Sequence, residues 1–333
     1  MTTMTTTMAA RTATRTTGRC ASDFGLWRAR SLELINGGLE KALGIYQDDR
    51  PAAVGTLGRA MAYSLLGGGK RLRPLLALAA GQAVGGRLPA ALPAALAVEM
   101  VHAYSLIHDD LPAMDDDDLR RGRPTCHKVF GEALAILAGD ALLALAFETL
   151  ARAAGQRPAA APRVNRALLE LARAAGGLSL VGGQALDLSF EKRPLTAPEQ
   201  PAPPGDLSLD MVRDMEERKT GRLITAALVC GAALAGAEAP EFKRLKRLGR
   251  ALGLAFQIQD DLLNQCGDPA RLGKAVGSDA RRGKASFSLT GGREAAEREL
   301  AALIDDARQT AGTFKAPGGR LLGIIDSLTG RQA

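Results

Sequence analysis

Hydrophobic residues recur along most of the chain at the three- and four-residue spacing of amphipathic helices. The first such stripe is formed by Leu32, Leu34, Ile35, Leu39, Leu43 and Ile45. Further helices are expected from Arg73-Pro74 and from Pro93 toward Asp110, because proline is tolerated in the first turn of a helix. The same pattern returns near residues 131–154, 163–180, 207–235, 241–264 and 293–312. No alternating strand pattern is present, so the sequence predicts an all-α fold, a single large helical bundle.

Two segments break this pattern. Residues 193–206 contain five prolines and one glycine and are expected to form an insertion loop within one domain spanning residues 25–333. Residues 1–24 are expected to be a disordered tail or a transit peptide, because the first 21 residues contain nine threonines and three arginines but no acid. The expected location is the cytoplasm, or a plastid or mitochondrion if residues 1–21 are a transit peptide. The four cysteines are widely scattered, which favours a reducing compartment.

Composition narrows the class of protein only slightly. Hydrophobic residues make up 46% of the chain and charged residues 24%, which is typical of a soluble protein with a sizeable core. The longest charge-free apolar run, Leu223 to Ala237, is shorter than the ~18 residues that span a bilayer, so stable membrane insertion is not expected. The net charge is +7, but basic residues alternate with acids and lack interleaved aromatics. A nucleic-acid partner is therefore not expected.

The strongest chemical signal is an acidic cluster with six aspartates within ten residues, Asp109-Asp110 and Asp115 to Asp118, followed by Arg120-Arg121. Carboxylates at this spacing repel one another, and the first pair lies at the predicted C-terminal end of a helix, where acids are disfavoured. Pro112 should end that helix and return the later acids toward the first pair. Such a cluster is often only a solvated loop, but the apolar helix before it favours a site for Mg²⁺ or Ca²⁺. The spacing excludes an EF-hand.

A second acidic pair, Asp260-Asp261, follows another apolar helical stretch. Asp260 and Asn264 are four residues apart and share one helix face, with Gln257 one turn earlier. Alone, such a pair is more often a surface feature. Together with the first cluster it predicts a multi-metal site between two helices that face the core.

A glycine run followed by cations, Gly67-Gly68-Gly69-Lys70-Arg71-Leu72-Arg73, is suited to binding phosphate at a helix start. It is not a Walker A loop, because no Ser or Thr follows the lysine. Further cations occur at Lys219, Lys274 and Lys284, each of which alone could be an ordinary surface lysine. Cations and acids together indicate a diphosphate substrate held both by metal ions and by direct contacts.

Five motifs, in order, resemble the trans-isoprenyl diphosphate synthase (polyprenyl synthetase) family, especially bacterial-type farnesyl and related geranylgeranyl diphosphate synthases. They are residues 68–74 (GGKRLRP), residues 102–122 with the acidic cluster, residues 182–187 (GGQALD), Lys219-Thr220-Gly221, and residues 256–268 running into Gly273-Lys274. The resemblance covers about residues 32–306 and implies the all-α isoprenoid synthase bundle with a central cavity. It also implies a homodimer.

The resemblance implies a role for each matching residue. Asp109 and Asp115 would ligate two Mg²⁺ ions and Asp260 a third, with Mn²⁺ as a substitute. The residues expected to bind isopentenyl diphosphate are Lys70, Arg73, His102 and Arg121. Arg120, Lys219 and Lys274 would contact the allylic diphosphate, Gln257 would lie near the second motif and Thr220 near the reacting carbons. The expected catalytic set is Asp109, Asp110, Asp115, Asp260, Lys219 and Thr220.

The implied reaction is the head-to-tail condensation of isopentenyl diphosphate with dimethylallyl or geranyl diphosphate. Tyr104 and Ser105 precede Asp109 by about one helical turn, where a bulky ring could form the floor of the product pocket. A fifteen-carbon farnesyl product is favoured, and a geranylgeranyl or geranyl product is the alternative.

Two departures and two rival functions remain. Asn264 stands where the family commonly has a third aspartate, and Gly283 to Ser288 lacks the usual closing proline. These departures are the only support for a non-catalytic regulatory subunit of a prenyl synthase. A class I terpene cyclase is disfavoured because it would lack the Lys70 and Arg73 site for a second diphosphate.

Overall fold

The computed structural model describes residues 5–46, 51–156, 160–190, 207–266, 286–314 and 319–329. These residues are almost entirely helical, which confirms the predicted all-α class. The helices are α1 (Thr5–Leu43), α2 (Ala52–Leu65), α3 (Leu72–Ala83), α4 (Leu92–Asp109), α5 (Cys126–Phe130), α6 (Glu132–Gln156), α7 (Ala161–Ala175), α8 (Leu180–Phe190), α9 (Leu209–Glu216), α10 (Arg222–Ala235), α11 (Ala239–Cys266), α14 (Phe287–Gly291), α15 (Arg293–Gly312) and α16 (Arg320–Thr329). Short elements are the 3-10 turns η1 (Gly44–Tyr46) and η2 (Leu88–Ala91), the π-helical turn η4 (Glu217–Gly221), and strands β1 (Leu119–Arg120) and β2 (Arg123–Pro124).

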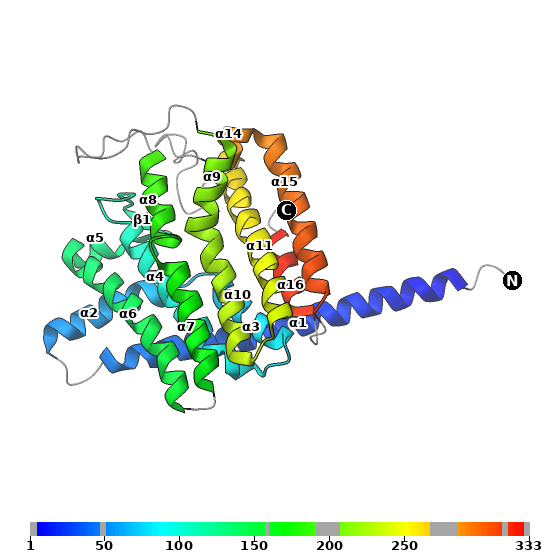
Figure 1. Ribbon diagram of the computed structural model, residues 1–333, viewed down its shortest axis with the longest axis horizontal. Helices are drawn as coiled ribbons and strands as arrows, with labels where there is room; N and C mark the ends of the chain where they lie inside the picture. The colour runs from blue at the N-terminus through cyan, green and yellow to red at the C-terminus, as the bar shows by residue number, and fades with distance from the viewer. Residues whose placement is uncertain are drawn as a thin grey trace.

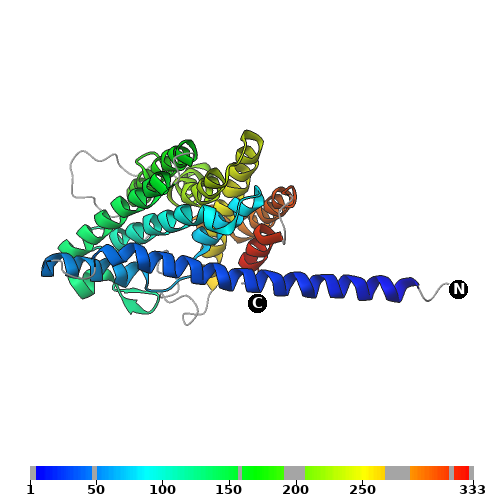
Figure 2. The same ribbon diagram turned by 90° about the horizontal axis from the view of Figure 1, so that it is seen from below.

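The core of the bundle forms around α10, which packs against α3, α4, α7 and α11. Nearly every residue of α10 from Leu223 to Leu234 is buried, because the helix is apolar on all sides and lies between other helices. One hydrophobic cluster runs from Trp27 to Leu328 through most of the helices. In Figure 1, α7, α10, α11 and α15 follow one another across the bundle, and α1 crosses its lower end and projects beyond it, as Figure 2 also shows.

Several predicted boundaries were wrong. The stretch expected at residues 163–180 is divided at Gly176, after which α8 extends to Phe190. The stretch expected at 207–235 is interrupted by η4, a π-helical turn that hydrophobic periodicity does not reveal. A small hairpin, β1–β2, interrupts the helical order after the acidic cluster. Helix α1 begins at Thr5, within the segment expected to be a tail, and the loop at 193–206 lies outside the described residues.

Two helical segments are long and apolar enough to cross a membrane by length and composition alone. Residues 88–109 are 67% buried in the bundle, as expected for a core helix, whereas residues 132–155 are 39% buried. Neither segment is a charge-free run, since Glu99 lies in the first and Asp140 in the second. The more exposed segment, in α6, is therefore an apolar surface of the described chain.

Glycines bring the elements of the site close together. A β-carbon added at Gly183 on α8 would lie 2.3 Å from the backbone nitrogen of Lys219 in η4. One added at Gly253 on α11 would lie 2.4 Å from the Cα of Gly221. No β-carbon fits at either distance. The π-helical turn is therefore held between α8 and α11 at van der Waals contact, which places Lys219 and Thr220 beside the second acidic motif.

Candidate active site

The first acidic cluster begins at the end of α4 and folds back on it. The Asp115 amide donates to the Asp109 carbonyl at 2.8 Å, and the Asp117 amide donates to the Asp110 carbonyl at 3.3 Å. Because Pro112 has no amide hydrogen and cannot continue the helical hydrogen bonds, the chain turns there. The predicted return of the later acids toward the first pair is confirmed.

The hairpin after this cluster presents Arg120 and Arg121. Arg120 pairs with Arg123 across the strands, which leaves Arg121 and Gly122 as a two-residue loop. Both have positive φ, 55° and 74°, which is the geometry of a type I′ turn. Adjacent arginines thus point to different partners: the Arg121 guanidinium contacts the carbonyl of Gly68, whereas Arg120 faces the end of α4.

Arg120 forms a close ion pair with Asp110. Its Nε lies 2.7 and 2.8 Å from the two oxygens of Asp110, and its Nη2 lies 2.5 Å from the first of them. Asp110 is 3% exposed, so this pair is largely shielded from solvent. Burial alone lowers the pKa of Arg120, but the hydrogen bond and charge of Asp110 outweigh it and raise that pKa. Asp110 is therefore paired with a protein cation, as is the exposed Asp118, whose Oδ1 lies 2.6 Å from Lys128 Nζ.

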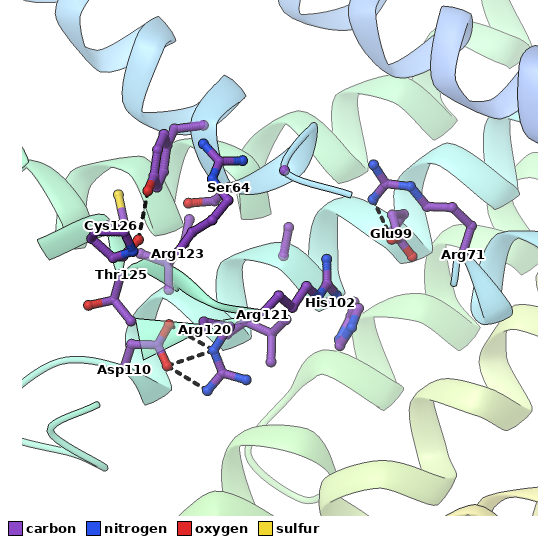
Figure 3. Close-up of a pocket in the computed structure, with 16 residues that line it drawn as sticks. Ser64, Arg71, Glu99, His102, Asp110, Arg120, Arg121, Arg123, Thr125 and Cys126 are labelled. Carbon is purple, nitrogen blue, oxygen red and sulfur yellow. Dashed lines mark hydrogen bonds and ion pairs between the residues drawn. The ribbon is translucent and has the colours of Figure 1, made fainter. Parts of the chain in front are cut away.

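A group of cations, here called the cation pocket, lies between the start of α3, the middle of α4 and the hairpin (Figure 3). It comprises Arg71, His102 and Arg121, with Glu99 as the buried acid. Arg73 belongs to the same group because its charge interacts with those of Glu99 and Arg121 and acts on His102. Arg71 donates to Glu99 Oε1 at 2.7 Å and to the Leu65 carbonyl at 2.8 Å. Lys70 is exposed beside the pocket. The sequence analysis placed Arg71 in a phosphate-binding run and gave no role to Glu99, although a lone glutamate one turn before His102 in an apolar helix was a usable signal.

The positive charge and the burial of the cation pocket lower the pKa values of its own residues. Burial lowers the pKa of Arg73, and the Nε of this residue has no hydrogen-bond partner among the described residues. Burial, together with the neighbouring arginines, also holds the pKa of His102 well below 6.5, so its imidazole is neutral at pH 7. Uncompensated cations crowded around a neutral ring are suited to binding an anion such as a diphosphate.

A second group, here called the carboxylate face, comprises Asp109, Asp115 and Asp187 with Lys219. Lys219 Nζ is 2.6 Å from Asp187 Oδ2. Burial alone lowers the pKa of Lys219, but the charges of Asp187, Asp109 and Asp115 outweigh it and raise that pKa. The sequence analysis gave no role to Asp187 beyond its place at the end of the third motif. The structure places it on α8, facing the π-helical turn.

The two aspartates of the second motif have different surroundings. Asp260 is half-buried, and its charge acts on Arg73. Asp261 is 6% exposed and accepts hydrogen bonds from Gln257 Nε2 at 3.2 Å and from the Phe287 amide at 2.9 Å. Gln257 Oε1 in turn accepts a hydrogen bond from Thr220 Oγ1 at 3.2 Å. The predicted residues Gln257 and Thr220 are therefore brought together. Asp261 accepts a hydrogen bond from the Gln257 amide and thereby fixes its orientation.

Tyr104 and Ser105 lie one turn below Asp109 on α4. Tyr104 is 5% exposed, and its ring is edge-on to that of His108 with 5.7 Å between the centroids. Burial, with a smaller contribution from Asp109, raises the pKa of Tyr104 to about 12. Ser105 Oγ donates to the His102 carbonyl, so its hydroxyl is directed at its own helix. Lys274 and Lys284 lie outside the described residues.

The acids present suit Mg²⁺ only in combination with a ligand. Among the described residues, no group of three or more His, Cys, Asp or Glu side chains forms a ready metal cage. Mg²⁺, however, usually keeps several waters and binds one or two carboxylates plus substrate phosphates. Asp109 and Asp115, joined through the backbone and both acting on Lys219, provide hard oxygen donors of this kind.

The chain is similar to known proteins of a single family. Residues 54–316 match the Polyprenyl synthetase family. The farnesyl diphosphate synthase of Geobacillus stearothermophilus is 42% identical over 277 residues, covering 83% of this chain and 89% of that protein. The large subunit 1 of the heterodimeric geranylgeranyl pyrophosphate synthase of Arabidopsis thaliana is 41% identical over 311 residues, covering 93% of this chain and 80% of that protein. The crystal structure of an FPP/GFPP synthase from Zymomonas mobilis has a TM-score of 0.77 at 35% identity, covering 92% of this chain and 99% of that one.

The chain belongs to the polyprenyl synthetase family and is a prenyltransferase with the isoprenoid synthase fold. Relatives making farnesyl and geranylgeranyl diphosphate are about equally similar to it, so similarity does not select the product.

Proposed function

We propose that this enzyme condenses isopentenyl diphosphate with dimethylallyl or geranyl diphosphate, head to tail, to make farnesyl diphosphate. The observation that carries the proposal is the division of one site into a cation pocket and a carboxylate face, separated by the Asp110–Arg120 pair. The cation pocket suits isopentenyl diphosphate, whose diphosphate stays attached. The carboxylate face suits the allylic diphosphate, whose diphosphate leaves.

Asp109, Asp115 and Asp260 are proposed to hold Mg²⁺, three ions per site with Mn²⁺ as a substitute, and these ions supply neutralising charge to the leaving diphosphate. Lys219 adds a cation of this chain to the same leaving group, because Asp187 holds its ammonium in place. Arg73, His102 and Arg121, with Lys70, orient isopentenyl diphosphate so that its double bond faces the allylic carbon. Thr220 and Gln257 lie beside the reacting carbons, and apolar helix walls exclude water from the allylic cation.

The direct test incubates purified protein with Mg²⁺, isopentenyl diphosphate and each of dimethylallyl, geranyl and farnesyl diphosphate, followed by product identification. A dominant farnesyl product supports the proposal. A geranylgeranyl or geranyl product would support the proposed condensation but reject a fifteen-carbon product. No turnover with any starter, in folded protein that binds diphosphate, would instead support the regulatory subunit suggested by Asn264.

Tyr104 is proposed to set the chain length as the floor of the product pocket. Its buried ring lies one turn below Asp109 and packs edge-on against His108, so it would meet the growing end of the prenyl chain. Tyr104→Ala should shift the product toward longer diphosphates, measured by chromatography of the extracted products. Ser105→Ala is the control, because the Ser105 hydroxyl is directed at its own helix. An unchanged product distribution in Tyr104→Ala would show that the Tyr104 ring does not limit the length of the product.

We also propose a homodimer formed through α6. Ile136 and Leu137 of this helix are 44% and 53% exposed, and α6 is the less buried of the two longest apolar segments. The Ile136 carbonyl lies 3.0 Å from His108 Nε2, so this surface adjoins the helical turn before Asp109. One relative is named as a heterodimeric large subunit, which makes a smaller partner chain the alternative occupant.

Light scattering of the purified chain tests this assembly. The wild type should have the mass of a dimer, and Leu137→Glu should shift it to a monomer. Leu169→Glu is the matched control, because Leu169 is 51% exposed but lies on α7. A monomeric wild type, or dissociation by both substitutions alike, would reject the α6 interface.

The enzyme is proposed to act in the cytoplasm, with a plastid or mitochondrion as the alternative. The relatives include proteins named as chloroplastic and a bacterial enzyme. N-terminal sequencing of the protein from its own cells distinguishes the two, because a transit peptide would be removed near residue 21.

A further inference from the structure

The second strand of the hairpin is held by one aromatic side chain of α2. The Tyr63 hydroxyl donates a hydrogen bond to the Pro124 carbonyl at 2.7 Å. The Arg123 guanidinium lies over the Tyr63 ring, 4.5 Å from its centroid, in a cation–π contact. The Phe130 ring of α5 meets the same ring edge-on, with 5.6 Å between the centroids. Tyr63 therefore contacts both residues of β2 and the short helix that follows the hairpin.

The hairpin also lies against the glycine run that leads into α3. A β-carbon added at Gly67 would lie 2.7 Å from the Tyr63 carbonyl and 3.4 Å from Arg123 Nη1, so the Arg123 side chain packs over the start of this run. One residue further on, the Gly68 carbonyl accepts a hydrogen bond from the Arg121 guanidinium. The glycine run and the hairpin thus meet at two points, one at Arg121 and one at the pair of Arg123 and Tyr63.

The rest of the hairpin is bound to the acidic cluster. In β1, Arg120 is paired with Asp110 at the end of α4. At the base of the hairpin, Thr125 Oγ1 donates to the Asp117 carbonyl at 2.8 Å. These bonds fix the hairpin relative to α4, whereas the contacts of Tyr63 fix it relative to α2 and the glycine run. In Figure 3, Arg121 extends from the hairpin toward His102.

We propose that Tyr63 is a positioning residue for isopentenyl diphosphate, because it holds β2 against α2 and thereby places Arg121 in the cation pocket. This inference rests on the proposed function for its kinetic consequence, since isopentenyl diphosphate is the substrate expected in that pocket. The carboxylate face is built from α4, the turn after it, α8 and η4, and it includes neither α2 nor the hairpin. A defect at Tyr63 should therefore affect one substrate and not the other.

The kinetic test compares Tyr63→Phe with the wild type, varying each diphosphate in turn. Tyr63→Phe keeps the ring beneath Arg123 and removes only the hydroxyl. It should raise KM for isopentenyl diphosphate about two- to tenfold, as expected for the loss of one neutral hydrogen bond, and leave kcat and KM for the allylic diphosphate unchanged. Tyr63→Leu also removes the ring and should raise the first KM further.

Tyr46→Phe is the matched control for this substitution. Tyr46 is also half-buried, and its β-carbon packs against Gly58 of the same helix α2, away from the hairpin. Removing its hydroxyl should leave the KM values of both substrates unchanged. An equal loss for both substrates in Tyr63→Phe, or an unchanged KM for isopentenyl diphosphate in both Tyr63 variants, would overturn the positioning role.

A double substitution separates positioning from packing. If Tyr63 acts through Arg121, Tyr63→Phe should have no further effect on KM for isopentenyl diphosphate once Arg121→Ala has been introduced. If Tyr63 instead supports only the local packing, the two substitutions should multiply their effects on this KM. The second result would overturn the inference.

Calorimetric binding of inorganic diphosphate, in chelator, provides a readout that does not depend on turnover. Tyr63→Phe should weaken this binding by the same two- to tenfold factor, and Tyr46→Phe should not. Equal affinity of the wild type and Tyr63→Phe would overturn the inference even in an active synthase. A wild type whose diphosphate binding depends on Tyr63 but which forms no prenyl product would support the positioning role and reject only the proposed function.

Discussion

The cation pocket and the carboxylate face lie on either side of one ion pair, yet they carry opposite charge and are stabilised differently. In the cation pocket, Glu99 binds Arg71 and leaves Arg73, whose buried Nε has no partner among the described residues, beside a neutral His102. In the carboxylate face, a single lysine lies among several aspartates. The first can bind an anion directly, whereas the second requires added cations before it can bind one.

This difference corresponds to the proposed chemistry. A diphosphate that remains on its substrate needs only a fixed counter-charge, which rigid guanidinium groups provide. A diphosphate that leaves gains charge in the transition state, which mobile divalent ions neutralise. The substitutions below are chosen because each should affect one side and leave the other intact.

The largest effect is expected from Glu99→Ala. Removing this carboxylate leaves the Arg71 guanidinium buried without its counter-ion, since the two side chains are only 4% and 5% exposed. Loss of one partner from a buried pair costs about 3–5 kcal/mol of unfolding free energy. Urea unfolding measures this change, and Glu170→Ala, which removes a more exposed pair with Lys246, should cost far less. Equal losses in the two variants would show that Glu99 is not the anchor of the cation pocket.

Asp109→Asn should be the largest change on the carboxylate face. It keeps the shape of the side chain but removes a charge that acts on Lys219 and would hold Mg²⁺. We expect kcat to fall by about 10²–10³, as when one stabilising group of a transition state is lost. Binding of isopentenyl diphosphate, measured by calorimetry, should be unchanged. Weakened isopentenyl binding in this variant would mean that the two sides are not separate.

The smallest effect is a pH dependence that belongs to the cation pocket. Because burial and the arginines depress the pKa of His102, the unfolded chain binds a proton below about pH 6.5 that the folded chain does not. Stability from this group is therefore present above pH 6.5 and is lost as the pH falls. Urea unfolding between pH 8 and pH 5 should show a decline that is smaller in His102→Gln. An identical decline in both proteins would contradict a neutral His102 in the folded protein.

The sequence was most informative where a local rule determines the structure. Pro112 predicted both the end of α4 and the return of the acidic cluster, because a proline beyond the first turn lacks the amide hydrogen that the helical hydrogen bonds require. The helical class could likewise be predicted, because the three- and four-residue spacing of hydrophobic positions is a local property of the sequence. The π-helical turn at Glu217–Gly221 could not be predicted in this way, because it depends on the close approach of α8 and α11 at Gly183 and Gly253.

The sequence was least informative about acids that act through burial. Glu99 and Asp187 look like ordinary helix residues, and only the fold shows that Glu99 binds Arg71 and that Asp187 binds Lys219. The pairing of acid with cation across elements requires the tertiary arrangement. Motif residues such as Lys219 and Gln257, in contrast, could be found from the resemblance because their spacing is local.

The most direct test of the division between the two sides is calorimetric binding of each diphosphate with and without Mg²⁺. We predict that isopentenyl diphosphate binds with similar affinity in chelator and in Mg²⁺, whereas a non-reacting thio analogue of geranyl diphosphate binds only when Mg²⁺ is present. An equal metal requirement for both ligands, or none for either, would contradict the separation of a cation pocket from a carboxylate face.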